Sequence, residues 1–166
     1  VVMKDGFIQQ IESPQNLYDH PNNLFVAGFI GTPPMNFVDA KLEQRADGVY
    51  AVMAEGEILV PEGRIQKLSD KTYIGKNVIL GIRPEDLHDE EIFLQSYPKS
   101  TINVYVDVVE LMGSETNLYF SYSGSNLIAR VDPRSTARAT DTIKIGLEGN
   151  KLHFFDPDTE LTIMDR

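Results

Sequence analysis

The sequence contains no cysteine, which excludes disulfide bonds and thiolate metal sites and fits a reducing compartment. It is also poor in basic residues, with 15 Lys and Arg against 25 Asp and Glu and a formal net charge of −10. A nucleic-acid backbone is bound by clustered Lys and Arg that displace its counterions. The composition therefore argues against a nucleic-acid partner.

Long apolar runs are missing too. No segment approaches the roughly 20 apolar residues that a membrane-spanning helix needs, and the first residues lack the basic start and apolar centre of a signal peptide. Hydrophobic residues make up 42% of the chain and charged residues 24%, which is typical of a globular protein. With 166 residues, the chain is long enough for one hydrophobic core, or for one domain with part of another.

The first 31 residues carry turn and helix signals. Residues 1–3 and 7–11 predict a short hairpin around Asp5-Gly6. Because two strands alone are marginal in water, we expect their neighbours to lie upstream of Val1. Ser13-Pro14 is typical of a helix start, and it predicts a first helix from residue 14 to about residue 20. Asn22 or Asn23 is expected to cap a second helix, which ends at Gly31 and the following prolines.

From residue 35 onward the pattern changes to alternating apolar and polar residues. Short runs separated by turn signals predict a mainly β domain, a small barrel or sandwich. The predicted strands are residues 36–42, 49–53, 58–60, 77–82, 102–111, 117–122, 126–131, 142–145 and 152–155. The chain is thus expected to consist of a hairpin and two short helices in residues 1–34, followed by a β domain in residues 35–166.

Three stretches in this order resemble one protein family. They are VMKDGFIQQIESPQNLYDHPNNLFVAGFIGTPPMNF at 2–37, GIRPEDL at 81–87 and VVELMGSETNLYF at 108–120. Together they are similar to the ATPase subunit of carbohydrate ABC importers of the maltose and multiple-sugar type. The resemblance extends to HFFDPDTE at 153–160, whereas residues 61–76 and 88–101 match nothing that can be assigned.

The resemblance implies that residues 1–34 are the end of the nucleotide-binding domain. It implies that residues 35–166 form the C-terminal regulatory domain, an OB-like fold of the transport-associated (TOBE) type. The implied function is to couple subunit contact and regulator binding to ATP-driven sugar uptake. Implied partners are a second copy of the subunit, the membrane-spanning permease subunits and a regulatory protein. The implied location is the cytoplasmic face of the plasma membrane, with ATP and Mg²⁺ bound by the longer parent subunit.

The motifs of nucleotide hydrolysis are not found in the sequence. A P-loop needs G-x-x-x-x-G-K-[ST], but Gly75-Lys76 is followed by Asn77 and is preceded by Asp70 at the first glycine position. LSDKT at 68–72 shares only two letters with the family's signature motif. We therefore expect no catalytic residue, cofactor or metal in this chain, whose three histidines lack metal-ligand spacing.

Two turns are candidate contact sites for partners. In the first, Gly81, Arg83, Pro84, Glu85 and Asp86 end a strand, and the simplest interpretation is a corner pinned by an ion pair from Arg83 to Glu85 or Asp86. By resemblance, this corner also belongs to the surface that contacts regulators or the second subunit.

The second turn is Gly113, Ser114 and Glu115. It is interpreted first as a hairpin turn with positive φ at the glycine, then as a partner-contacting loop. An alternative is a nest of N–H groups that binds a small oxyanion, as a sensor module would. Glu110 and Glu115 flank the turn and are interpreted as solvated charges.

The remaining candidates are apolar. Phe154 and Phe155 are expected to alternate between the inside and outside of the barrel, and Phe155 is a candidate contact residue. In the helical part, a set of apolar residues is expected to pack against the ATPase core of the parent subunit. These residues are Leu17, Tyr18, Phe25, Phe29 and Ile30.

Overall fold

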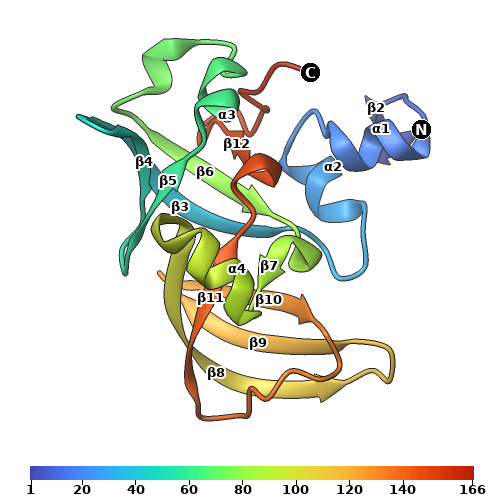
Figure 1. Cartoon of the computed structure of the whole chain (residues 1–166). Coiled ribbons are helices and arrows are strands. Elements are labelled where there is room, and N and C mark those ends of the chain that lie inside the picture. The colour runs from blue at the N-terminus through green and yellow to red at the C-terminus, as the bar shows by residue number, and fades with distance from the viewer.

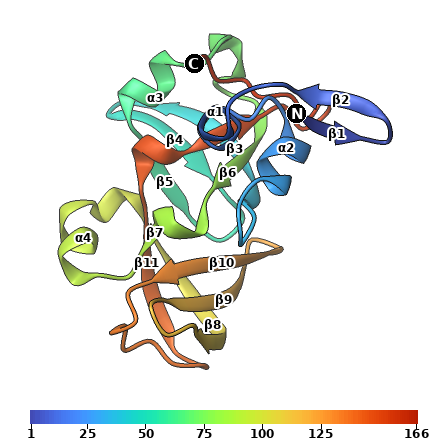
Figure 2. The same cartoon turned by 90° about the vertical axis from the view of Figure 1, so that its right-hand side faces the viewer.

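The computed structural model describes residues 1–166 and contains two five-stranded antiparallel sheets that enclose one core (Figure 1). Strand order is β12-β6-β3-β4-β5 in the first sheet and β10-β9-β8-β11-β7 in the second. Two helices lie beside the first sheet, and a separate hairpin, β1-β2, packs on these helices and projects away from the sheet (Figure 2). The predicted mainly β, OB-like architecture is confirmed.

The elements follow the predicted order closely. Their bounds are β1 (Val2–Lys4), β2 (Phe7–Gln10), α1 (Pro14–Asp19), α2 (Leu24–Phe29), β3 (Asn36–Arg45), β4 (Gly48–Val52), β5 (Glu57–Val60), α3 (Glu62–Gln66), β6 (Asn77–Ile82), β7 (Leu87–His88), α4 (Glu91–Ser96), β8 (Thr101–Leu111), β9 (Thr116–Tyr122), β10 (Ser125–Val131), β11 (Thr142–Leu147) and β12 (His153–Phe155). Short 3-10 helices are η1 (Lys71–Tyr73), η2 (Pro84–Asp86), η3 (Pro98–Ser100) and η4 (Gly149–Lys151). None of the helices has the length and apolarity that crossing a bilayer requires.

The core lies between the two sheets and draws on both. Alternate residues of β3, Val38, Ala40 and Leu42, face inward, as do Val104 and Val106 of β8. This period of two is what the sequence shows, because one face of each strand is buried and the other is solvated. Removal of these side chains from water is the main stabilising contribution to the fold.

The first 31 residues form a compact helical segment on the side of the first sheet (Figures 1 and 2). Both residues of the β1-β2 turn, Asp5 and Gly6, have positive φ, which matches the twist of a two-residue hairpin. The Ser13 hydroxyl accepts a hydrogen bond from the Asn16 N–H, and the Asn23 side chain accepts one from the Val26 N–H. These contacts confirm the predicted helix starts and select Asn23 over Asn22 as the second cap.

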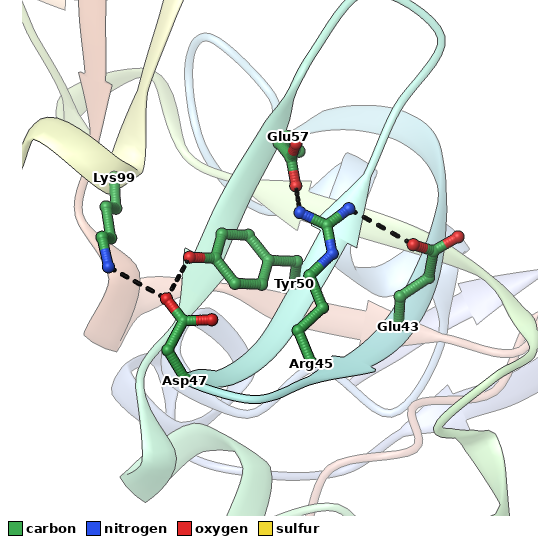
Figure 3. A network of polar contacts seen from close by, with 6 residues as sticks. All are labelled: Glu43, Arg45, Asp47, Tyr50, Glu57 and Lys99. Carbon is green, nitrogen blue, oxygen red and sulfur yellow. Dashed lines mark hydrogen bonds and ion pairs between the residues drawn. The ribbon is translucent and has the colours of Figure 1, made fainter.

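Polar contacts join the two sheets at several points. The Asn36 amide donates to the Ile128 carbonyl at 2.8 Å and accepts from the Ile128 N–H at 2.9 Å, so the side chain substitutes for a strand neighbour of β10. At the opposite end of β3, Lys99 and the Tyr50 hydroxyl both donate to Asp47 (Figure 3).

Figure 3 also shows a second set of polar contacts, around Arg45 at the end of β3. Arg45 pairs with Glu43 and Glu57, and its guanidinium lies 4.5 Å from the centre of the Tyr50 ring. The hydrogen bonds from Tyr50 and Lys99 hold the pKa of Asp47 at about 2, so this carboxylate stays ionised at neutral pH. The β3-β4 turn is thereby tied to η3, which leads into the second sheet.

The alternation predicted for the last strand is confirmed, but its outer face is not solvated. Phe154 and Phe155 point to the inside and the outside of the barrel, and both are buried. Phe154 belongs to the main core, whereas Phe155 packs on the opposite face against Ala27 and Met35. The outer face of β12 is therefore covered by the helical segment, so both of its faces are apolar.

Candidate functional site

The corner after β6 is built where the strand meets the helical segment. Gly81 approaches its neighbours so closely that an added Cβ would lie 2.6 Å from Met35 Sδ and 3.1 Å from Phe155 Cε2. Pro84 then begins η2, because its fixed φ suits the first position of a helix. Its side chain is buried. Glycine and proline at these positions therefore serve the packing of the corner.

Arg83 connects this corner to both helices. Only 2% of the residue is exposed, and its Nη1 and Nη2 donate to the carbonyls of Ile30 at 2.8 Å and Tyr18 at 2.6 Å. The guanidinium lies 3.7 Å from the centre of the Tyr18 ring, a close cation–π contact. These carbonyls belong to the C-terminal ends of α1 and α2, where the helix leaves its acceptors free and a cation is favoured.

The predicted ion pair from Arg83 to Glu85 or Asp86 is not formed. Its hydrogen-bond acceptors are backbone carbonyls far away in the sequence, which compensate the charge with dipoles rather than with a carboxylate. Burial lowers the pKa of Arg83 to about 10, and it remains protonated at neutral pH. Arg83 is thus a buried structural residue that joins the corner to the two helices, whereas the nearby Glu85 is partly exposed.

Asp86 occupies an unfavourable electrostatic environment. Burial, followed by the nearby Glu85 and Glu148 carboxylates, raises the pKa of Asp86 from 3.8 to about 6. Between these pH values the folded chain holds a proton that the unfolded chain has released, so the ionised form costs stability as the pH rises through 6.

We expect Asp86→Asn to raise the free energy of unfolding by about 1 kcal/mol near pH 8, a value reduced for solvent screening of this partly exposed group. The gain should vanish at a pH below the unfolded pKa of 3.8, where both states are protonated. Urea unfolding at the two pH values measures it. The exposed aspartate in Asp158→Asn is the control, and an equal gain at both pH values would contradict the prediction.

The β8-β9 turn is an exposed hairpin tip. Gly113 has a φ of +89°, and the Met112 N–H donates to the Glu115 carbonyl at 2.9 Å, which confirms the predicted hairpin turn. Leu111 and Met112 at this tip are 77% and 52% exposed. The tip therefore presents apolar side chains to solvent beside the predicted contact residues Gly113, Ser114 and Glu115.

The carboxylates that flank this turn have structural partners. Glu115 pairs with Arg130 at 3.2 Å, and Glu110 accepts a hydrogen bond from the Tyr119 hydroxyl at 2.7 Å. This hydrogen bond lowers the pKa of Glu110, the opposite of what an acid catalyst needs. Both residues therefore act as fixed surface charges of the hairpin.

Comparison with known proteins identifies the family of the β domain. Residues 31–87, which contain the buried corner around Arg83, match the family described as "MalK OB fold domain". The chain carries a MalK OB fold domain. Among relatives, it is 47% identical over 163 residues to the oligosaccharides import ATP-binding protein MsmX of Bacillus subtilis, covering 98% of this chain and 44% of that protein.

Further relatives have the same character. The multiple sugar-binding transport ATP-binding protein MsmK of Streptococcus mutans is 41% identical and covers 95% of this chain and 41% of its own length. The osmoprotective compounds uptake ATP-binding protein GgtA of Synechocystis is 35% identical over 98% of this chain and 43% of its own. The chain therefore spans less than half the length of these relatives. Over nearly its whole length it is similar to part of these ATP-binding proteins, and residues 31–87 carry the MalK OB fold.

The solved structure of the cytoplasmic molybdate-binding protein ModG, with molybdate bound, is similar over 74% of this chain and 94% of the ModG chain. The sequence identity is 12% and the TM-score is 0.49, which is too weak a likeness to indicate a ligand.

The helical segment beside the MalK OB fold domain covers most of its own apolar residues. Leu17 is buried with Val2 and Val26, and Phe25 and Ile30 pack at the edge of this small cluster. Tyr18 is covered by Arg83. Of the residues predicted to pack against an ATPase core, only Phe29 is largely exposed, at 63%.

Other apolar side chains of this segment face solvent. They are Val1, Met3, Phe7, Ile8 and Ile11 of the hairpin region, and they supplement Phe29 on the exposed surface of the segment. Of the apolar residues predicted to pack on an ATPase core, this exposed surface includes Phe29, and its other members come from the hairpin region. The reason is that α1 and α2 pack on each other and on the barrel.

Two residues of the MalK OB fold domain that link distant segments were missed in the sequence. Asn36 lies in the MNF motif, which carried the resemblance without a role for the asparagine. Arg64 of α3 lies in the unassigned residues 61–76, and it donates to the carbonyl of Leu152 before β12. An arginine in a weakly patterned helix gives no sequence signal, because its acceptor is a backbone carbonyl.

Proposed function

We propose that the chain is a regulatory and dimerisation module that couples subunit contact and regulator binding to ATP-driven sugar uptake. In this proposal residues 1–34 end the ATPase domain of a longer subunit, and residues 35–166 form the regulatory domain. That subunit binds ATP and Mg²⁺ in its other part, contacts membrane-spanning permease subunits and works at the cytoplasmic face of the membrane. The observation that carries the proposal is the similarity of nearly the whole chain to sugar-import ATP-binding proteins.

The contact between the helical segment and the barrel supports a mechanical role. Arg83 and Phe155 fix the helices to the barrel through buried contacts. A displacement of the helical segment therefore moves the barrel with it. A protein bound to the barrel biases the two states of the motor by as much as its affinity for those states differs.

The hairpin tip supports a contact role. Leu111 and Met112 expose apolar area next to Gly113, Ser114 and Glu115. These three residues remain predicted contact residues, together with the partly exposed Glu85 and Asp86. Gly81, Arg83, Pro84 and Phe155 are buried in the single chain, so in this proposal they shape the contact surface rather than touch a partner.

The oxyanion alternative has less support at this turn. Arg130, the cation nearest to Glu115, already pairs with it and donates to the Thr32 carbonyl. Calorimetry with molybdate and sulfate distinguishes the alternative, since heat of binding to this turn would favour it.

Sedimentation equilibrium from micromolar to millimolar concentration tests the dimer. The weight-average mass is expected to rise toward that of two chains, and Leu111→Asp at the hairpin tip is expected to hold it at one. Ile92→Asp in α4, a similarly exposed apolar residue outside the tip, is the matched control and should behave like the parent chain. A monomer throughout would overturn the dimerisation part of the proposal.

A further inference from the structure

A polar cleft of about 310 Å³ lies between the helical segment and the barrel. Its walls come from the end of α1, α3, η2, η4 and β12, which are far apart in the sequence but adjacent in the fold. Small-molecule sites in proteins have volumes of roughly 300–1,000 Å³. Its charged side chains are the cations Arg64, Arg83 and Lys151 and the carboxylates Asp19, Glu85 and Asp86, and the imidazoles of His20 and His153 lie among them.

One side of the cleft is basic, and its arginines lack counter-ions. Arg64 and Arg83 bond only to backbone carbonyls, and the Nε of each is buried without an acceptor. Elsewhere in this acidic chain, Arg130 and Arg134 pair with carboxylates. Two carbonyls compensate the charge of Arg83, whereas Arg64, which is only partly buried and has a single acceptor, keeps donors free for an anion.

The pKa of the His153 imidazole reflects the positive electrostatic potential on this basic side of the cleft. Burial, and then the charges of Arg64 and Arg83, lower the pKa of His153 to about 3. Both arginines therefore act on the same point of the cleft, and His153 is neutral near pH 7. A neutral imidazole in this position can donate one hydrogen bond to an anion.

The other side of the cleft is acidic. Glu85 and Asp86 of η2 line it, yet neither forms an ion pair with the arginines across the cleft. The fold thus keeps the carboxylates of Glu85 and Asp86 out of contact with the arginines, although Asp86 is close enough to raise the pKa of Arg83. A ligand that fits between them needs an anionic end and an end rich in hydrogen-bond donors.

We propose that this cleft binds a sugar phosphate as an effector. The Arg64 guanidinium and the Lys151 ammonium hold the phosphate, because planar arginine donors suit phosphate oxygens, and the buried charge of Arg83 adds to the positive potential there. The carboxylates of Glu85 and Asp86 accept hydrogen bonds from the sugar hydroxyls. Because the cleft is lined by residues of both the helical segment and the barrel, a bound sugar phosphate strengthens the contact between these two parts.

Calorimetry on the 166-residue chain with glucose 6-phosphate, inorganic phosphate and glucose tests the site. We expect glucose 6-phosphate to bind, inorganic phosphate to bind at least about tenfold more weakly, and glucose to give no measurable heat. Arg64→Gln should weaken both phosphate ligands by about tenfold. Lys151→Gln, at an exposed position, should weaken them in the same direction without disturbing the fold. The matched control is Arg138→Gln, an exposed arginine outside the cleft, which should bind like the parent chain.

The two halves of the site are tested separately. Glu85→Gln is expected to weaken glucose 6-phosphate and leave inorganic phosphate unchanged. Equal affinity for the two ligands would overturn the assignment of the hydroxyl side. Absence of binding at millimolar ligand, or binding that Arg64→Gln and Lys151→Gln leave intact, would overturn the site itself. Neither result depends on whether the chain dimerises, so this test and that of the proposed function fail independently.

Discussion

Replacement of Arg83 by glutamine is expected to loosen the helical segment and lower the free energy of unfolding by about 3 kcal/mol. The change removes the charged donors to the carbonyls of Ile30 and Tyr18, and with them the stacking on the Tyr18 ring. The shorter amide does not span both acceptors, so buried carbonyls lose their partners.

Urea unfolding measures the loss, and hydrogen exchange locates it. The amides of Leu17 in α1 and Ala27 in α2 should exchange faster, while those in β8 and β9 should change least. Arg138→Gln supplies the control for loss of a positive charge at an exposed position. Unchanged exchange in α1 and α2 would show that Arg83 does not hold the segment.

Phe155→Ala is expected to cost about 4 kcal/mol, because it leaves a cavity between the barrel and the helical segment. The ring is fully buried, meets Phe37 edge to face at 5.9 Å and packs on Ala27 and Met35. Phe7→Ala, at a ring that is 74% exposed, removes the same atoms and should change stability by less than about 0.5 kcal/mol.

Thermal and urea unfolding of the two variants provide the comparison. If Phe155→Ala were as mild as Phe7→Ala, the side chain would not be part of the core, and its earlier interpretation as a surface contact residue would be favoured. The expected difference is large enough to be read from the unfolding midpoints alone.

The parts of the fold predicted from the sequence are those with local causes. Asp5-Gly6 determines the hairpin turn, and Ser13 and Asn23 start the helices. Strand β6 has its predicted bounds because its short apolar run is bordered by turn residues. The helices α3 and α4 were missed, and their first residues have no side-chain cap. Helix α4 depends on tertiary packing, since Phe93 lies on Gly146 of β11 and stacks on His88 at 4.2 Å.

The contacts of Arg83 at the corner after β6 were not predicted from the sequence. The sequence singled out Arg83 and its neighbours, yet it could not show that the acceptors of Arg83 are the carbonyls of Tyr18 and Ile30. Backbone carbonyls leave no mark in a sequence, so a carboxylate nearby in the chain was the only visible partner. The contribution of Arg64 was missed for the same reason.

Because Phe155 is buried under the helical segment, its strand must be synthesised before that segment can pack on the barrel. Residues 1–31 leave the ribosome before the β domain, but the surface that receives Ala27 is completed only when β12 pairs with β6. The contact between the helices and the barrel therefore forms only after nearly the entire β domain has been made. A nascent chain halted before residue 155 would carry them undocked, open to capture by chaperones.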